Sequence, residues 1–282
     1  MRKSLRIPED DDDAEMPAVP SSYIPTSPTD SLLSPCTRKI IQRKAGINGS
    51  GSSGSGSEFR LSRRSSKMSY TLNIEQEAPP TTRDIVLGTS SSSRQKIISK
   101  LGWQVSVIFP DINEKSIRSD DPYKLPLVIA KAKADEVVKK IKSNSDMNEK
   151  DMIIITADQV VYFNGEVREK PTNEDEAKSF LSSYSNSSVS TISAIVVTHY
   201  PSGQQLSEVN ESKVYWNEIS ARVVDKVVSK GAIYQSAGGF QVEDEDLNNL
   251  INNIEGSVSC IMGLNVVTLK SLIKSLELEL SG

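Results

Sequence analysis

The chain has 282 residues, among them 33 Lys or Arg, 37 Asp or Glu and one His, which gives a formal net charge of −4 at pH 7. This length predicts one or two domains, and no run approaches the roughly 18 apolar residues of a membrane span, so an integral membrane protein is excluded. One histidine and two cysteines exclude zinc sites built on several histidines and any disulfide framework, and the slightly acidic balance argues against binding to duplex nucleic acid.

The first 67 residues differ in composition from the rest of the chain. They hold 11 basic and 8 acidic residues, leaving 22 and 29 for residues 68–282, and they contain a Gly/Ser-rich run at residues 48–57. Such a run cannot offset its own ordering entropy, so we predict a disordered tail over residues 1–82. Residues 1–67 resemble an engineered leader joined before Met68; a natural tail, whose Ser-Pro pairs would be phosphorylation sites, is the open alternative.

Residues 83–282 have the pattern of one α/β domain, in which apolar runs alternate with segments of helical spacing. The predicted elements are, in chain order, a strand at residues 85–87, a helix through 97–101, a strand at 105–109, a helix at 125–141, a strand at 152–155, a hairpin turn at 164–165, a helix beginning at 172–176, strands at 189–198 and 208–216, and helices at 219–228 and 266–276. The run Met152–Ile155 is continuously apolar, which is typical of a central strand covered on both faces.

The turn after the first predicted strand is rich in hydroxyl groups and leads into a helix. Backbone N–H groups and the positive end of the helix dipole favour phosphate at such a place. Ser91, Ser93 and Arg94 are therefore candidates for binding a phosphate group. Serine is also common where helices begin, so a purely structural cap is the alternative.

Charged side chains also lie beside two other predicted strands. Asp158 and Gln159 are expected at the end of the apolar strand, where α/β folds collect ligands, and the Asp158 carboxylate is a candidate metal ligand or general base. Lys170, held before Pro171 just after the hairpin, is placed to meet a phosphate. An Asp that caps a turn and a solvated Lys are the alternatives.

Three weaker signals complete the candidates. Glu114 lies in a polar loop, and Lys133 lies on an otherwise apolar helix; such residues are usually solvated. The segment Ala237–Glu243 contains paired glycines that let the backbone approach a ligand closely, and the carboxylate of Glu243 could accept hydrogen bonds from the edge of a base.

Taken in order, seven short motifs match one family. They are Gly88–Arg94, Asn113-Glu114, Ala130–Ala134, Ala157–Val161, Glu169-Lys170-Pro171, Ala237–Phe240 and Gly263-Leu264. Over residues 84–277 this set resembles the Maf family, whose members are nucleoside triphosphate pyrophosphatases named for a septum-formation phenotype. The resemblance implies an α/β fold with a mixed, twisted sheet flanked by helices, similar to that of inosine triphosphatases.

The resemblance also implies a reaction, the hydrolysis of a nucleoside triphosphate between its α- and β-phosphates, with a divalent metal (Mg²⁺ or Mn²⁺) and in a homodimer. By position, Asp158 and Glu114 match the family's catalytic and metal-holding acids, and Arg94, Lys133 and Lys170 match cations that face phosphate, with Lys170 expected to take part in catalysis. We expect a cytoplasmic enzyme that removes modified nucleotides and has no nucleic-acid or membrane partner.

Substrate choice also follows from the resemblance. Gln159 directly after Asp158, with Glu243, resembles the subgroup that prefers 7-methyl-GTP, not the one that prefers dTTP and UTP. Glu243 could accept hydrogen bonds from guanine N1–H and N2–H₂, which pyrimidines lack. Ser93 stands where that subgroup can carry an aromatic residue, and Gln95 replaces a family arginine.

Two other hypotheses stay open at this point. The chain could be a catalytically weak nucleotide-binding regulator of cell division that acts through protein partners, which the loss of an arginine at Gln95 would favour. Alternatively, the tail docks a partner and the domain is its scaffold.

Overall fold

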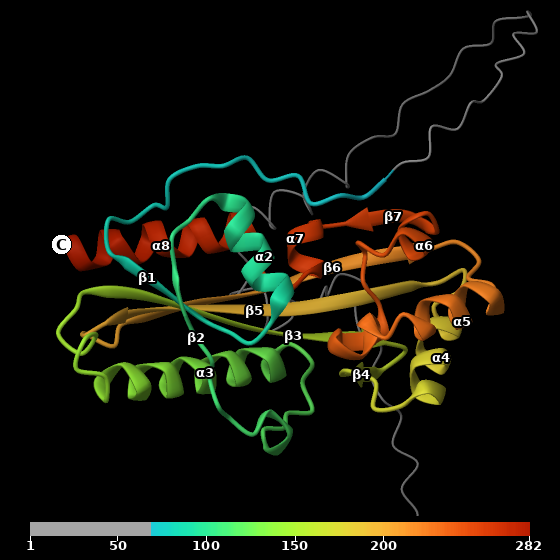
Figure 1. Ribbon diagram of the computed structural model, residues 1–282, viewed down its shortest axis with the longest axis horizontal. Coiled ribbons are helices and arrows are strands. Elements are labelled where there is room, and N and C mark those ends of the chain that lie inside the picture. The colour runs from blue at the N-terminus through green and yellow to red at the C-terminus, as the bar shows by residue number, and fades with distance from the viewer. Residues whose placement is uncertain (1–68) are drawn as a thin grey trace, which may run out of the picture. The chain divides into compact units, whose positions relative to one another are not determined.

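The computed structural model describes residues 69–282; the predictions for residues 1–68, including most of the disordered tail, lie outside the described residues. The described part is built around a mixed sheet of seven strands, ordered β2-β1-β3-β5-β6-β7, with β4 paired to β3 (Figure 1). Helices flank this sheet, so the α/β class expected from the sequence is confirmed.

The strands are β1 (Asp84–Gly88), β2 (Ser106–Ile108), β3 (Met152–Phe163), β4 (Glu166–Arg168), β5 (Ser188–Tyr200), β6 (Gln205–Trp216) and β7 (Ile251–Glu255). The helices are α2 (Ser92–Leu101), α3 (Lys124–Lys142), α4 (Glu174–Ser183), α5 (Ala221–Ser229), α6 (Glu245–Asn248), α7 (Val258–Ile261) and α8 (Val266–Ser281), with 3₁₀ turns η2 (Glu114–Ser116), η3 (Ala232–Gln235) and η4 (Ala237–Gly239). Each strand and helix predicted from the sequence is present. β7 was not predicted, because its sequence Ile-Asn-Asn-Ile-Glu lacks an apolar run.

The central strand β3 is longer than its apolar run. The sequence predicted a strand that ends at Ile155, with Asp158 beyond it. In the structure β3 continues to Phe163, because its residues pair with β5 in unbroken antiparallel register, with Asp158 opposite Ala194. The expectation that Asp158 follows the end of its own strand is therefore wrong, and the carboxylate projects from the middle of a strand.

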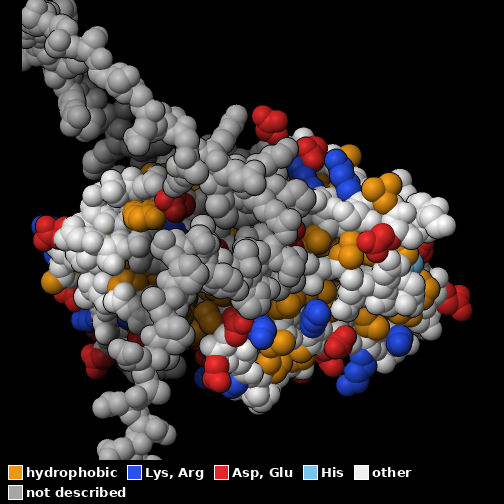
Figure 2. All heavy atoms as spheres, turned by 180° about the vertical axis from the view of Figure 1, so that it is seen from behind, with side chains coloured by type: hydrophobic (Ala, Val, Ile, Leu, Met, Phe, Trp, Pro, Cys, Tyr) orange, Lys and Arg blue, Asp and Glu red, His pale blue; other side chains and the backbone are white. Residues whose placement is uncertain are grey.

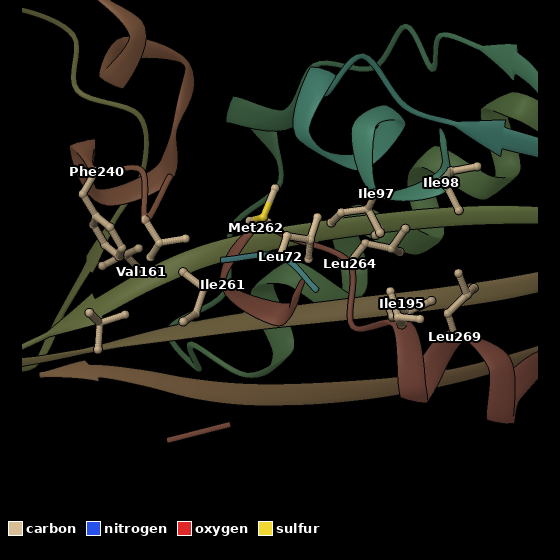
Figure 3. Close-up of a cluster of buried hydrophobic side chains, with 14 of the residues drawn as sticks. Leu72, Ile97, Ile98, Val161, Ile195, Phe240, Ile261, Met262, Leu264 and Leu269 are labelled. Atoms are coloured by element: carbon tan, nitrogen blue, oxygen red, sulfur yellow. The ribbon is translucent and has the colours of Figure 1, made fainter. Parts of the chain in front are cut away.

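Helices cover both faces of the sheet (Figure 1). On one face, Ala130 and Ala134 of α3 share a buried cluster with Ala194 of β5. On the other face, α2 and α8 supply side chains such as Ile97 and Leu269 to the largest hydrophobic cluster (Figure 3). Because helices cover both faces, β3 and β5 are buried along nearly their whole length, and several Ser and Thr side chains of β5 are buried with its apolar ones.

The predicted Asn-Gly hairpin is confirmed between β3 and β4. Asn164 and Gly165 have φ angles of 49° and 86°, the left-handed conformation that a tight two-residue turn requires. Phe163 pairs with Glu166 directly across the turn. The hairpin returns the chain along β3 and delivers the segment that contains Lys170.

Residues 69–82, which the sequence placed in the disordered tail, lie against the domain as an extended segment. Leu72 is buried in the largest hydrophobic cluster (Figure 3). Trp103 donates its indole N–H to the Glu77 carbonyl at 2.9 Å, and Lys100 donates to the Leu72 carbonyl at 3.1 Å. These contacts make the segment part of the packed domain, whereas the predicted boundary was residue 83.

The surface of the described domain carries charges of both signs. On the face seen in Figure 2, acidic and basic side chains are interspersed among the visible residues. Within residues 69–282, none of the helices combines the length and apolar character needed to cross a membrane.

Replacing Leu72 with Ala tests whether residues 69–82 stabilise the domain. We expect the free energy of unfolding to fall by about 2 kcal/mol, because a buried leucine side chain is lost. Urea denaturation of the full chain measures this change, and the variant with Ala at the exposed neighbour Glu75 is the control. Equal stability of the two variants would mean that the segment contributes nothing.

Candidate active site

A cleft of about 1040 Å³ opens beside the middle of β3. One edge of β3 pairs with β1 as far as Thr156, opposite Gly88, and with β4 from Val161, opposite Arg168. Asp158 lies in the interval between these two pairings. Ligands of α/β folds bind beyond the carboxyl ends of parallel strands, and here that position is the end of β1 rather than of β3.

The structure brings the candidates from the sequence together in this cleft. Its lining includes all nine predicted site residues: Ser91, Ser93, Arg94, Glu114, Lys133, Asp158, Gln159, Lys170 and Glu243. They come from α2, η2, α3, β3 and the segments that follow β4 and η4. Their juxtaposition is a property of the fold, while their roles in binding and catalysis stay predictions.

Lys133 is at the centre of the charged groups. Its Nζ lies 2.6 Å from Oδ1 of Asp158 and 3.0 Å from Oε1 of Glu114. The side chain of Lys133 is only 6% exposed and that of Asp158 9%, whereas Glu114 is 44% exposed. The interpretation of Lys133 as a solvated lysine is thus wrong: a buried ammonium joins a buried carboxylate to one that faces the cleft mouth.

The packing of α3 on β3 fixes this contact. The hydroxyl of Thr156 donates to the backbone carbonyl of Ala130 at 2.8 Å, less than one helical turn from Lys133. Burial raises the pKa of Asp158, and this effect is opposed by the charges of Lys133 and Arg94. The positive charges of Lys133 and Arg94 therefore stabilise the buried carboxylate of Asp158.

Arg94 and Gln159 are both tied to the end of α7 and the residues that follow it. Arg94 donates from Nε to the Gly263 carbonyl at 2.9 Å, and Gln159 donates from Nε2 to the Ile261 carbonyl at 2.9 Å. Gly263 has a φ of 97°, and a Cβ there would lie 2.3 Å from Oε1 of Gln159. Only glycine therefore permits this close approach, which fixes the orientation of both side chains.

The start of α2 combines capping with exposure to the cleft. The hydroxyl of Ser91 accepts from the backbone N–H of Arg94 at 3.4 Å, so the capping alternative describes what this serine does. Ser93 lies in the first turn and is half-buried. Both serines line the cleft, where the positive end of the α2 dipole favours an anion.

The position of Lys170 depends on Arg168, the last residue of β4. The Arg168 guanidinium lies over the rings of Phe163 and Phe180, 4.6 and 4.7 Å from their centroids, and donates to Ser183 Oγ at 2.7 Å. The next carbonyl, that of Glu169, accepts from the backbone N–H of Gly238 at 2.9 Å. Lys170 follows this anchored segment and is exposed in the cleft lining.

Glu243 is held by a partner that the sequence did not indicate. Lys96 of α2 places its Nζ 2.6 Å from Oε1 of Glu243. The pair connects α2 to the segment that follows η4. It leaves the carboxylate at the cleft wall with one oxygen engaged by a lysine.

Glu114 and Asp158 are the residues predicted to hold a metal. In the part of the chain that the structure describes, no group of three or more His, Cys, Asp or Glu side chains is placed to hold one. Mg²⁺ usually needs only one or two carboxylates and completes its shell with water and substrate phosphates. Lys133 contacts only Oδ1 of Asp158 and Oε1 of Glu114, so the second oxygen of each carboxylate is the one that would hold such a cation together with a phosphate-bearing substrate.

Some cleft residues were not selected from the sequence. Lys115 and Arg118 are exposed cations of the lining, and both come from the polar segment around η2, whose sequence lacks a distinctive pattern. Gln95, which replaces a family arginine, follows Arg94 on α2 but is outside the described lining.

Replacing Lys133 with Met tests the buried ion pair. We expect the free energy of unfolding to fall by about 3 kcal/mol, because Asp158 loses its nearest counter-charge. Adding Asp158→Asn to this variant should recover most of the loss, since no buried charge is then left unpaired. Urea denaturation measures both changes, with Met at the exposed Lys131 of the same helix as the control. An equal effect of the two single lysine variants would contradict a stabilising pair.

Comparison with known families gives two matches along the chain. Residues 26–47, outside the described part, match the Spo12 family. Residues 84–276, which contain the whole cleft, match the family described as Maf-like protein.

Curated relatives agree with the second match. The chain is 34% identical to a 7-methyl-GTP pyrophosphatase of Dictyostelium discoideum over 197 residues, which cover 70% of this chain and 99% of the relative. It is 28% identical to a dTTP/UTP pyrophosphatase of Treponema denticola, over 70% of this chain and 99% of the relative. It is 32% identical to a dTTP/UTP pyrophosphatase of Chlamydia trachomatis, over 70% and 95%. The chain therefore belongs to the Maf family.

Proposed function

We propose that this chain hydrolyses a nucleoside triphosphate between its α- and β-phosphates and releases a nucleoside monophosphate and pyrophosphate. Membership of the Maf family and the activities named for its relatives support this reaction. The observation that carries it is the pair Asp158 and Glu114, held by Lys133 in a cleft lined by cations. A cytoplasmic homodimer that removes modified nucleotides stays a prediction from the family resemblance.

Asp158 is the group proposed to activate water. The water oxygen attacks the α-phosphorus, its proton passes to the carboxylate, and the bond to the oxygen bridging the α- and β-phosphates breaks to release pyrophosphate. Lys133 holds Oδ1 of Asp158 at 2.6 Å and so fixes the orientation of the carboxylate.

Cations on several sides of the cleft oppose the charge of the substrate. Arg94 approaches from α2 and Lys170 from the segment after β4, so together they can contact different phosphates of one chain. Their charges offset the negative charge that builds on the leaving pyrophosphate. Ser91 and Ser93, at the α2 N-terminus, offer additional hydrogen-bond donors.

A divalent cation fits the same carboxylates. Glu114 and Asp158 would hold Mg²⁺ or Mn²⁺ together with the substrate phosphates, and the metal when bound supplies positive charge that neutralises the phosphate oxygens. Glu114 is well suited to this role because its side chain is the more exposed of the two.

With respect to the nucleobase, we propose that the substrate is 7-methyl-GTP or another modified purine nucleotide. The Dictyostelium relative, named 7-methyl-GTP pyrophosphatase, supports this choice. Glu243 lies in the cleft wall with Oε1 on Lys96, so its second oxygen can accept from guanine N1–H or N2–H₂. Pyrimidines such as those of dTTP and UTP lack this pair of neighbouring donors.

Replacing Asp158 with Asn tests the reaction itself. We expect the rate of pyrophosphate release to fall by about 100-fold or more, because the proton acceptor is lost. Release is measured with a panel of nucleotides, and EDTA followed by Mg²⁺ or Mn²⁺ tests the metal. Equal, negligible release from the wild type and the variant would contradict the hydrolase and favour the nucleotide-binding regulator.

Replacing Glu243 with Gln tests the choice of base. The wild type should cleave 7-methyl-GTP faster than dTTP. In the variant we expect kcat/KM for 7-methyl-GTP to fall about tenfold, because a charged acceptor becomes a neutral one, while the value for dTTP is unchanged. The exposed Glu245→Gln variant is the control. Faster cleavage of dTTP by the wild type would overturn the proposed specificity.

A further inference from the structure

The cleft contains an exposed arginine, Arg118, whose only side-chain ion pair among residues 69–282 joins two segments of the lining that are distant in the sequence. Arg118 lies between η2 and α3, and Glu169 lies between β4 and α4. One guanidinium nitrogen of Arg118 is 3.2 Å from Oε1 of Glu169 and also donates to the Ile117 carbonyl at 3.0 Å. Both side chains of the pair line the cleft.

The ion pair between Arg118 and Glu169 is weak enough for another anion to replace Glu169. The side chain of Arg118 is 54% exposed and that of Glu169 is 45% exposed, and ion pairs that accessible are weak because water and salt screen them. An arginine has a planar fork of donors that matches phosphate as well as carboxylate. A polyanion that enters the cleft can therefore replace Glu169 as the partner of Arg118.

The other cations of the cleft are more tightly engaged. Lys133 contacts two carboxylates, and Arg94 is buried with its Nε on the Gly263 carbonyl. The exposed cations are left to contact the outer part of a phosphate chain, and Arg118 reaches Glu169, the residue directly before Lys170. Arg118 and Lys170 therefore form a pair of positive groups at one side of the cleft.

We propose that Arg118 is a further substrate-binding residue, which contacts the phosphates that leave as pyrophosphate and which Glu169 holds when no substrate is bound. The inference deepens the proposed function and rests on it for the identity of the polyanion. Two opposite effects follow: loss of Arg118 weakens binding, whereas loss of the Glu169 charge strengthens it, because the arginine is released and a repelling carboxylate is removed.

Calorimetric titration of the full chain with inorganic tripolyphosphate and Mg²⁺ tests the contact without a base. We expect binding to weaken about tenfold in Arg118→Gln and to strengthen about threefold in Glu169→Gln. The gain from Glu169→Gln should shrink when Arg118 is already Gln, since no arginine remains to be released. Arg222→Gln, an exposed arginine of α5, is the matched control.

Steady-state kinetics provide the second readout. In Arg118→Gln the KM should rise by the same factor for 7-methyl-GTP and dTTP, because the contact is to phosphate and not to the base, and Arg118→Lys should recover part of the loss. Unchanged tripolyphosphate binding in Arg118→Gln, no binding by the wild type, or an equal gain from Glu169→Gln in both backgrounds would overturn the inference. If no nucleotide is hydrolysed while the binding pattern holds, the proposed function fails and Arg118 remains an anion-binding residue.

Discussion

The burial of one lysine ammonium connects the fold to its cleft. Lys133 is nearly inaccessible, and such a charge is stable only with carboxylates in contact, which Asp158 and Glu114 provide. Asp158 in turn depends on the pairing of β3 with β5, and Glu114 on the conformation of η2. The apolar contacts of α3 with the sheet bring these parts together. Core packing and the geometry of the site are therefore one constraint, so a change in either alters both.

The sequence predicted the elements well where local composition decides the structure. The apolar run at Met152–Ile155 and the Asn-Gly turn each determine a local conformation, and both were found as expected. The extension of β3 through Asp158 was not predicted, because the polar residues there form a strand only through their pairing with β5. The packing of residues 69–82 was missed for the same reason: Leu72 is buried by groups distant in sequence.

The same distinction applies to the site. The nine residues selected from ordered motifs all line one cleft, since a family pattern records which positions lie close together, while their roles stay predictions. They could not reveal that Lys133 is buried, that Lys96 engages Glu243, or that Arg118 reaches Glu169. Each of these contacts joins segments distant in the chain. The packing of α3 on β3 decides the burial of Lys133, and the segments after η4 and around η2 decide the other two. Contacts of this kind depend on tertiary geometry, which local sequence propensity does not predict.

The unbroken register of β3 with β5 gives the two sides of the cleft different local stability, one on β3 and one on the segment around η2. Asp158 projects from a strand that pairs with β5 along this whole stretch, so the amides that donate to β5 should exchange slowly with solvent, on the scale of global unfolding. Glu114 belongs to the single 3₁₀ turn η2 and Arg118 to the exposed chain after it, where local opening requires far less energy. The reacting phosphate of a substrate would thus meet a preorganised surface on β3. Any part of the cleft that becomes ordered on binding would belong to the segment around η2. Away from Glu114, which contacts Lys133, a sequence change in that segment can alter which substrate is bound without disturbing β3.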